Sequence, residues 1–112
     1  MSDFDVAILG AGPGGYAAAL YGAAAGLRVA LVHDDDLGGT CLNRGCIPAK
    51  SLLHTAELYR SVQRAADFGI VPERDPGGFK GDWSRVSQRT TGIVDRLVGG
   101  LGGLLKQRKV DV

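Results

Sequence analysis

Residues 4–15 read FDVAILGAGPGG, an apolar run of β-formers that ends in a glycine-rich turn. Residues 4–9 are typical of a buried parallel strand. The turn fits the pattern GxGxxG, which indicates dinucleotide binding when it lies between a strand and a helix. We assign Gly10 to the tight turn, Gly12 to close approach by a pyrophosphate and Gly15 to helix–strand packing, with the phosphates facing the helix N-terminus. A plain glycine turn is the alternative.

The residues after this turn complete a strand–helix–strand unit. Residues 14–25 are rich in alanine and are followed by Gly26, which stands in a helix-stop position. Residues 28–33 form a second apolar run and predict the next strand. This order within about 30 residues predicts a βαβ unit with a right-handed crossover.

A second helix is expected over residues 40–66, with Gly69 after its end. It carries apolar residues on roughly one face, namely Leu52, Ala56, Tyr59 and Val62. Residues 71–81 contain several prolines and glycines and predict a surface loop, including Pro76 and Gly77.

A third helix is expected to begin after Asp82, a candidate N-terminal cap. Apolar residues recur along it at intervals of three or four up to Leu104. Four glycines interrupt it, which we interpret as marks of close packing against a neighbouring element: Gly99, Gly100, Gly102 and Gly103. Residues 110–112 have the character of a further strand at its beginning.

Composition limits the chain to one ordinary domain. It has 112 residues, 45% of them hydrophobic, and a net charge of +1, which excludes a disordered or nucleic-acid-coating protein. Residues 6–27 carry no charge, but glycines and Pro13 interrupt them, and Asp3 and Asp5 precede them. We therefore expect a cytoplasmic protein with no membrane segment and no nucleic-acid partner.

The end of the second predicted strand departs from the usual dinucleotide pattern. An acidic residue normally stands there and binds the adenosine ribose, but this sequence has His33. Asp34 could substitute through a one-residue shift, or His33 could contact the ribose through weaker hydrogen bonds. We interpret Asp35 and Asp36 as part of a solvated loop.

Two cysteines, Cys41 and Cys46, lie within residues 38–50, GGTCLNRGCIPAK. A disulfide across so few residues removes little entropy from the unfolded chain, so redox cycling explains it better than structural stapling. A helix N-terminus would favour the reactive thiolate. Two buried free cysteines are one alternative, and half of a zinc site is another. The zinc alternative is weak because His33 and His54 lack ligand spacing, and we assign no metal.

Lys50 stands four residues after Cys46, about one helical turn, and should share its face. It could place positive charge near the same cofactor atoms as the cysteine. The alternative is an ordinary surface lysine whose aliphatic stem lies along the protein.

The glycine turn followed by residues 38–50 resembles the flavin-dependent pyridine nucleotide-disulfide oxidoreductases. The sequence is most similar to the dihydrolipoamide dehydrogenase branch, through Leu42, Ile47 and residues 51–54, and also through residues 98–101 and 106–110. Glutathione and mercuric reductases share the cysteine motif and are the rival assignment.

This resemblance implies a doubly wound, Rossmann-like α/β FAD-binding domain, of which residues 1–112 would be the incomplete N-terminal part. The FAD pyrophosphate would be held by Gly10, Gly12, Pro13, Gly14 and Gly15, with Gly39 and Thr40 along it. Cys41 would be the thiol that faces the substrate, Cys46 the thiol against the flavin, and Lys50 a residue near the flavin ring. His33 departs from the family's usual glutamate, and Ala49 from its common serine.

The resemblance also implies partners. In the intact enzyme, electrons would pass from a dihydrolipoyl group on the acyltransferase of a 2-oxo acid dehydrogenase complex, through the cysteines and FAD, to NAD. Family members are several times longer, with an NAD domain and an interface domain that forms a homodimer. We therefore expect an N-terminal fragment or truncated reading frame, catalytically inactive by itself and a flavin-binding module at best.

Overall fold

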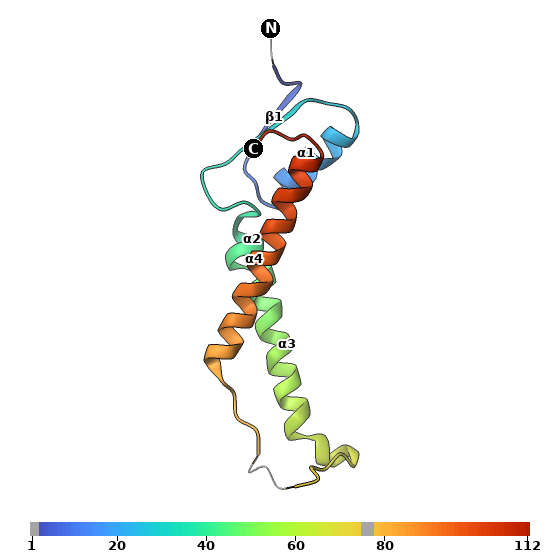
Figure 1. Ribbon diagram of the computed structural model, residues 1–112, viewed down its shortest axis with the longest axis vertical. Helices are drawn as coiled ribbons and strands as arrows, with labels where there is room; N and C mark the ends of the chain where they lie inside the picture. Colours follow the sequence, from blue (N-terminus) through green and yellow to red (C-terminus); the bar gives the residue numbers. More distant parts are fainter. Residues whose placement is uncertain (1–2, 75–77) are drawn as a thin grey trace.

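The computed structural model describes residues 3–74 and 78–112, which form an α/β head and a long helical arm (Figure 1). The molecule measures 73 × 24 × 18 Å along its principal axes. No helix in the described ranges is long and apolar enough to cross a membrane. The elements are β1 (Val6–Leu9), α1 (Pro13–Ala24), β2 (Val29–Val32), α2 (Gly39–Arg44), α3 (Cys46–Gln63), the 3-10 helix η1 (Ala65–Phe68) and α4 (Trp83–Gln107). Pro76 and Gly77 of the predicted loop lie outside the described residues.

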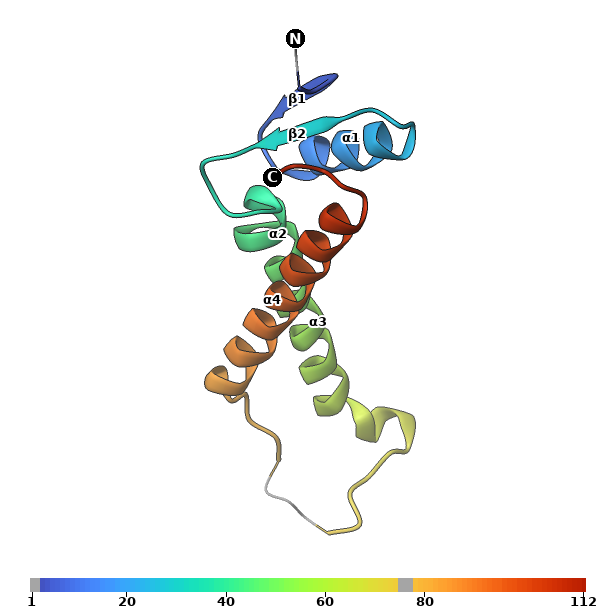
Figure 2. The ribbon, with the colours of Figure 1, turned by 45° about the horizontal axis from the view of Figure 1, so that its top comes forward.

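The head contains the predicted βαβ unit. Strands β1 and β2 are parallel, with Val6 opposite Val29 and Leu9 opposite Val32, and α1 lies against one side of the sheet (Figure 2). On the other edge of β2, the N–H of Leu31 donates to the carbonyl of Asp111 at 2.7 Å. The fold class expected from the sequence is confirmed, and residues 110–112 do begin to pair with the sheet.

The expectation that β1 is a buried strand is wrong. Leu9 is 84% exposed and Val6 is 36% exposed, whereas Val29 and Leu31 of β2 are 1% exposed. Burial of a parallel strand needs partners on its edges and layers on both of its faces. Among the described residues, β2 is the only strand paired with β1.

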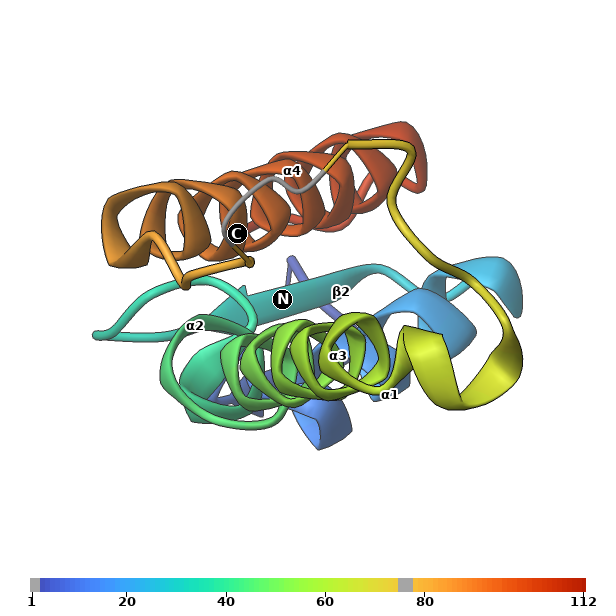
Figure 3. The ribbon, with the colours of Figure 1, turned by 90° about the horizontal axis from the view of Figure 1, so that it is seen from below.

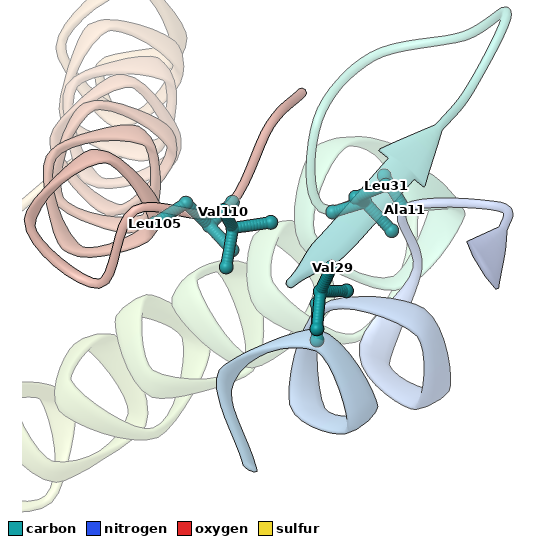
Figure 4. Close-up of a cluster of buried hydrophobic side chains, with 6 residues drawn as sticks. Ala11, Val29, Leu31, Leu105 and Val110 are labelled. Carbon is teal, nitrogen blue, oxygen red and sulfur yellow. The ribbon is translucent and has the colours of Figure 1, made fainter. Parts of the chain in front are cut away.

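The core of the head joins the sheet, α1 and the C-terminal end of α4 (Figure 4). Leu105 of α4 is completely buried, and Val110 just beyond the helix is 6% exposed. The buried apolar cluster consists of Ala11, Ala19, Val29, Leu31, Leu105 and Val110. The last turns of α4 therefore anchor the arm to the head.

The single helix expected over residues 40–66 is two helices. Gly45 separates α2 from α3, with φ −126° and ψ −110°. A methyl group at Gly45 would lie 3.0 Å from the carbonyl oxygen of Thr40 and 3.3 Å from Cα of Cys41. The helix is interrupted at Gly45 because the tight turn between α2 and α3 leaves little room for a side chain.

The arm consists of α3 and α4, which lie side by side (Figure 3). The predicted apolar face of α3 is mostly exposed, since Leu52, Ala56 and Tyr59 are exposed and Val62 is only partly buried. This apolar face is therefore largely uncovered in the described structure.

Polar side chains join the two arm helices instead. Ser51 of α3 is 6% exposed, and its hydroxyl lies 3.0 Å from the hydroxyl of Thr90 on α4. The guanidinium of Arg89 also donates to this hydroxyl at 3.0 Å. Residues 39 positions apart make this contact, so no local sequence signal could indicate it.

Asp82 caps α4 as predicted, because its carboxylate accepts from the N–H of Arg85 at 3.2 Å. The glycines of α4 are not generally sites of close packing. A methyl group at Gly102 would lie 3.6 Å from the side chain of Leu37, but one at Gly99, Gly100 or Gly103 would meet nothing within 4 Å. A distance of 3.6 Å is an ordinary van der Waals contact, so the interpretation of these four glycines as marks of close packing is wrong for the described structure.

Lys109 offers a test of local backbone strain. It follows α4 with φ 57°, a left-handed conformation that costs a non-glycine residue about 1–2 kcal/mol. Lys109→Gly should therefore raise the free energy of unfolding by about 1 kcal/mol, measured by urea denaturation. The control Lys106→Gly, inside α4, should lower it by about 1 kcal/mol. Equal effects of the two changes would contradict the prediction.

Candidate functional site

The glycine turn between β1 and α1 is shaped for close packing. Gly10 has φ 101°, which favours glycine, and its N–H donates to the carbonyl of Val32 at 2.7 Å. A methyl group at Gly15 would overlap the carbonyl oxygen of Gly10 and would lie 3.6 Å from the side chain of Leu31. The first turn of α1 thus packs directly on the end of β1, as the assignments of Gly10 and Gly15 require.

Space opens on the other side of the same turn. A methyl group at Gly10, Gly12 or Gly14 would meet no atom of the described chain within 4 Å. Helix α1 begins at Pro13 with no side-chain cap and no acidic residue in its first turn. Free N–H groups and the positive end of the helix dipole attract anions. The turn therefore fits the pyrophosphate of a dinucleotide such as FAD.

The segment that carries the cysteines packs against this turn. The N–H of Gly38 donates to the carbonyl of Ala11 at 2.9 Å. A methyl group at Gly39 would lie 2.8 Å from Cα of Gly12, so only glycine allows α2 to start this close. Thr40 follows immediately. A ligand on the glycine turn would consequently meet the beginning of α2.

Cys41 of α2 and Cys46, the first residue of α3, form a disulfide with their Cα atoms 4.7 Å apart. The alternative of two buried free cysteines is therefore wrong. Cys46 is exposed and Cys41 is partly buried. The division of roles between the two sulfurs stays a prediction.

Helix α3 favours negative charge at Cys46. Its 18 residues begin at this cysteine, and no side-chain cap and no acidic residue stand in its first turn. The positive end of the helix dipole therefore stabilises the Cys46 thiolate that reduction would release. Lys50, one turn later, is exposed on the same helix.

His33 and Asp34, the first two residues after β2, have different surroundings. The ring of His33 forms a hydrogen bond through Nδ1 with the carbonyl oxygen of Asp35. Asp34 is exposed, and its carboxylate has no hydrogen-bond or ion-pair partner in the part of the chain that the structure describes. The choice between His33 and Asp34 as the ribose contact stays a prediction.

The interpretation of Asp35 and Asp36 as merely solvated is incomplete. The guanidinium of Arg44 forms two hydrogen bonds with the carboxylate of Asp35, one of them at 3.3 Å, and contacts Asp36 at 3.1 Å. The bond from Arg44, followed by one from the N–H of Asp36, lowers the pKa of Asp35. Asp35 raises the pKa of Arg44 in turn. Sequence reasoning missed Arg44 because its partners lie eight and nine residues away.

A dinucleotide-type turn joined to a helix-borne disulfide is typical of the class of nucleotide-dependent disulfide oxidoreductases. Residues 4–112 match the family described as pyridine nucleotide-disulphide oxidoreductase. The chain belongs to this family.

Curated relatives agree with this assignment. The chain is 44% identical to a dihydrolipoyl dehydrogenase of Bacillus subtilis over 99% of its own length and 23% of the relative. It is 42% identical to that of Acholeplasma laidlawii over 98% of its length and 32% of the relative. It is 45% identical to that of Chlamydia muridarum over 97% of its own length and 23% of the relative. The chain thus spans about a quarter to a third of the length of these relatives.

Proposed function

We propose that this chain is the FAD-binding, disulfide-bearing segment of a dihydrolipoyl dehydrogenase-type enzyme. The supporting observation is the direct packing of α2, which carries Cys41, on the open glycine turn. The carbonyl of Ala11 and the N–H of Gly38 join the two segments at 2.9 Å. One ligand could therefore have its pyrophosphate on the turn and its ring system near the disulfide.

The proposed FAD site uses residues of both segments. The N-terminal end of α1 binds the pyrophosphate, with Gly39 and Thr40 beside it. The residues of the glycine turn whose backbone holds the pyrophosphate are Gly10, Gly12, Pro13, Gly14 and Gly15. Lys50 lies near the ring, and FAD supplies the means to accept an electron pair from the cysteines and deliver it to NAD.

The half-reaction that we propose for the protein begins at the disulfide. A substrate thiolate attacks Sγ of Cys41, breaks its bond to Cys46, forms a mixed disulfide and releases Cys46 as a thiolate. The second substrate thiol loses its proton and attacks the substrate sulfur of the mixed disulfide, so Cys41 leaves as a thiolate. The dihydrolipoyl group loses two electrons and two protons, and the cysteine pair gains the two electrons.

The transfer of electrons to NAD would use residues other than those of the flavin site. The 112 residues contain one glycine-rich dinucleotide turn, which the proposal assigns to FAD, and NAD would bind at a separate site. A lipoyl-bearing acyltransferase as electron donor, a homodimer and a cytoplasmic location are parts of the same proposal. We expect the 112-residue chain alone to show no turnover of NADH with lipoamide.

The visible spectrum of the chain tests this proposal. The chain is mixed with FAD, freed of excess flavin and then treated with a dithiol. Retained flavin with a long-wavelength shoulder after reduction is the expected result, because the Cys46 thiolate would lie against the ring. Failure to retain FAD would overturn the proposed flavin site in this chain.

Two serine variants assign the sulfurs. Cys41→Ser should show the shoulder without any dithiol, since Cys46 is then unpaired at the N-terminus of α3. Cys46→Ser should retain flavin equally and show no shoulder before or after reduction. A shoulder that persists in Cys46→Ser would reverse the proposed roles of the two cysteines.

A further inference from the structure

The loop between β2 and α2 is held by side chains at almost every position. Arg44 contacts the carboxylates of Asp35 and Asp36 from the last position of α2. The amide of Asn43 donates to the carbonyls of Leu37 and Gly39 at 3.0 Å each. The loop is therefore tied to α2 at its acidic end and at its glycine end.

Within this loop the three adjacent carboxylates are not equivalent. Asp35 and Asp36 share the positive charge of one guanidinium, while Asp34 is exposed with no partner in the described ranges. A dinucleotide brings two phosphate charges to the nearby glycine turn, and three unpaired carboxylates would repel it. Pairing by Arg44 leaves one carboxylate free to accept hydrogen bonds from a ribose.

We propose that Arg44 is a positioning residue for the adenosine end of FAD: it holds Asp35 and Asp36 against α2 and presents Asp34 to the ribose. This inference rests on the proposed function, because it names the residues that serve the same cofactor site. It explains how the site works although His33 stands at the usual acidic position. The ring of His33 is bound to the carbonyl of Asp35 and so belongs to the same network.

A guanidinium is required for this arrangement because its planar fork can meet two carboxylates at once. Exposed ion pairs generally stabilise a protein little. The expected effect of Arg44 is therefore on loop order and ligand affinity rather than on global stability. The pKa of Asp35, lowered chiefly by the Arg44 hydrogen bond, is consistent with a formed pair.

Amide hydrogen exchange in the chain without any ligand tests the first half of the proposal. The N–H of Gly38 donates to Ala11, and the N–H of Gly39 donates to the carbonyl of Asp36, both at 2.9 Å. In Arg44→Gln these amides should exchange about fivefold faster while the thermal midpoint of the chain is unchanged. Unchanged exchange at both amides would overturn the proposal.

Binding of FAD, ADP and FMN, followed by fluorescence or calorimetry, tests the second half. Arg44→Gln and Asp34→Asn should each weaken FAD and ADP about three- to fivefold. Both should leave FMN unaffected because FMN lacks the adenosine. Arg44→Lys should restore part of the affinity, since lysine keeps the charge without the fork.

Arg64→Gln is the matched control, because Arg64 forms a comparable exposed ion pair with Asp67 at 3.4 Å in the arm. It should change neither exchange at Gly38 nor nucleotide affinity. Equal ADP affinity of the unsubstituted chain and Arg44→Gln would overturn this proposal and leave the proposed function standing. Failure of the unsubstituted chain to bind both FAD and ADP would overturn both.

Discussion

Replacement of Gly15 by alanine should destabilise the head more than the addition of one methyl group at any other glycine of the head. The added Cβ would overlap the carbonyl oxygen of Gly10 and lie 2.8 Å from its carbonyl carbon. Both are backbone atoms, so no flexible side chain can move aside, and β1 would have to separate from α1. We expect a loss of about 3 kcal/mol or more in the free energy of unfolding.

Gly14→Ala is the matched control for this prediction. A methyl group at Gly14 meets nothing within 4 Å, and both glycines lie in the first turn of α1. Since alanine favours a helix by about 1 kcal/mol over glycine, Gly14→Ala should unfold at the same or a higher urea concentration than the unsubstituted chain. Urea unfolding of both variants is monitored by circular dichroism. Equal urea midpoints would contradict the assignment of Gly15 to helix–strand packing.

The parts of the fold that sequence reasoning could predict depend on local signals. The βαβ unit follows from an apolar run, a glycine turn and an alanine-rich helix that are adjacent in the chain. The cap at Asp82 follows from one residue type at one position, and the structure confirms it. The disulfide of Cys41 and Cys46 is also a local feature, since both cysteines stand in the short motif on which the resemblance to the family rests.

The parts that sequence reasoning could not predict depend on contacts through space. The periodicity of residues 40–66 gives no sign of the break at Gly45, which depends on how tightly α2 turns into α3. The exposure of β1 depends on which layers cover it. The ion pairs of Arg44 and the contact of Ser51 with Thr90 join residues that are at least eight positions apart in the sequence, so no local pattern predicts these contacts.

Truncation of Leu105 should separate the arm from the head. Leu105 is 0% exposed and belongs to the core cluster that includes Leu31 and Val110. Leu105→Ala should cost about 2–5 kcal/mol, through lost burial and the cavity left behind. Such a loss is a large part of the stability of a small domain, about 5–15 kcal/mol. The urea midpoint should fall accordingly.

Leu104→Ala provides the control, since it makes the same change at the next position of α4, where the side chain is 40% exposed. Both variants alter helix propensity equally, so their difference isolates burial in the head. The N–H of Leu31 reports the separation directly, because it donates to Asp111 beyond the end of α4 at 2.7 Å. It should exchange faster in Leu105→Ala and at the normal rate in Leu104→Ala. If the two variants share one urea midpoint and one exchange rate, the arm is held to the head by contacts other than those of Leu105.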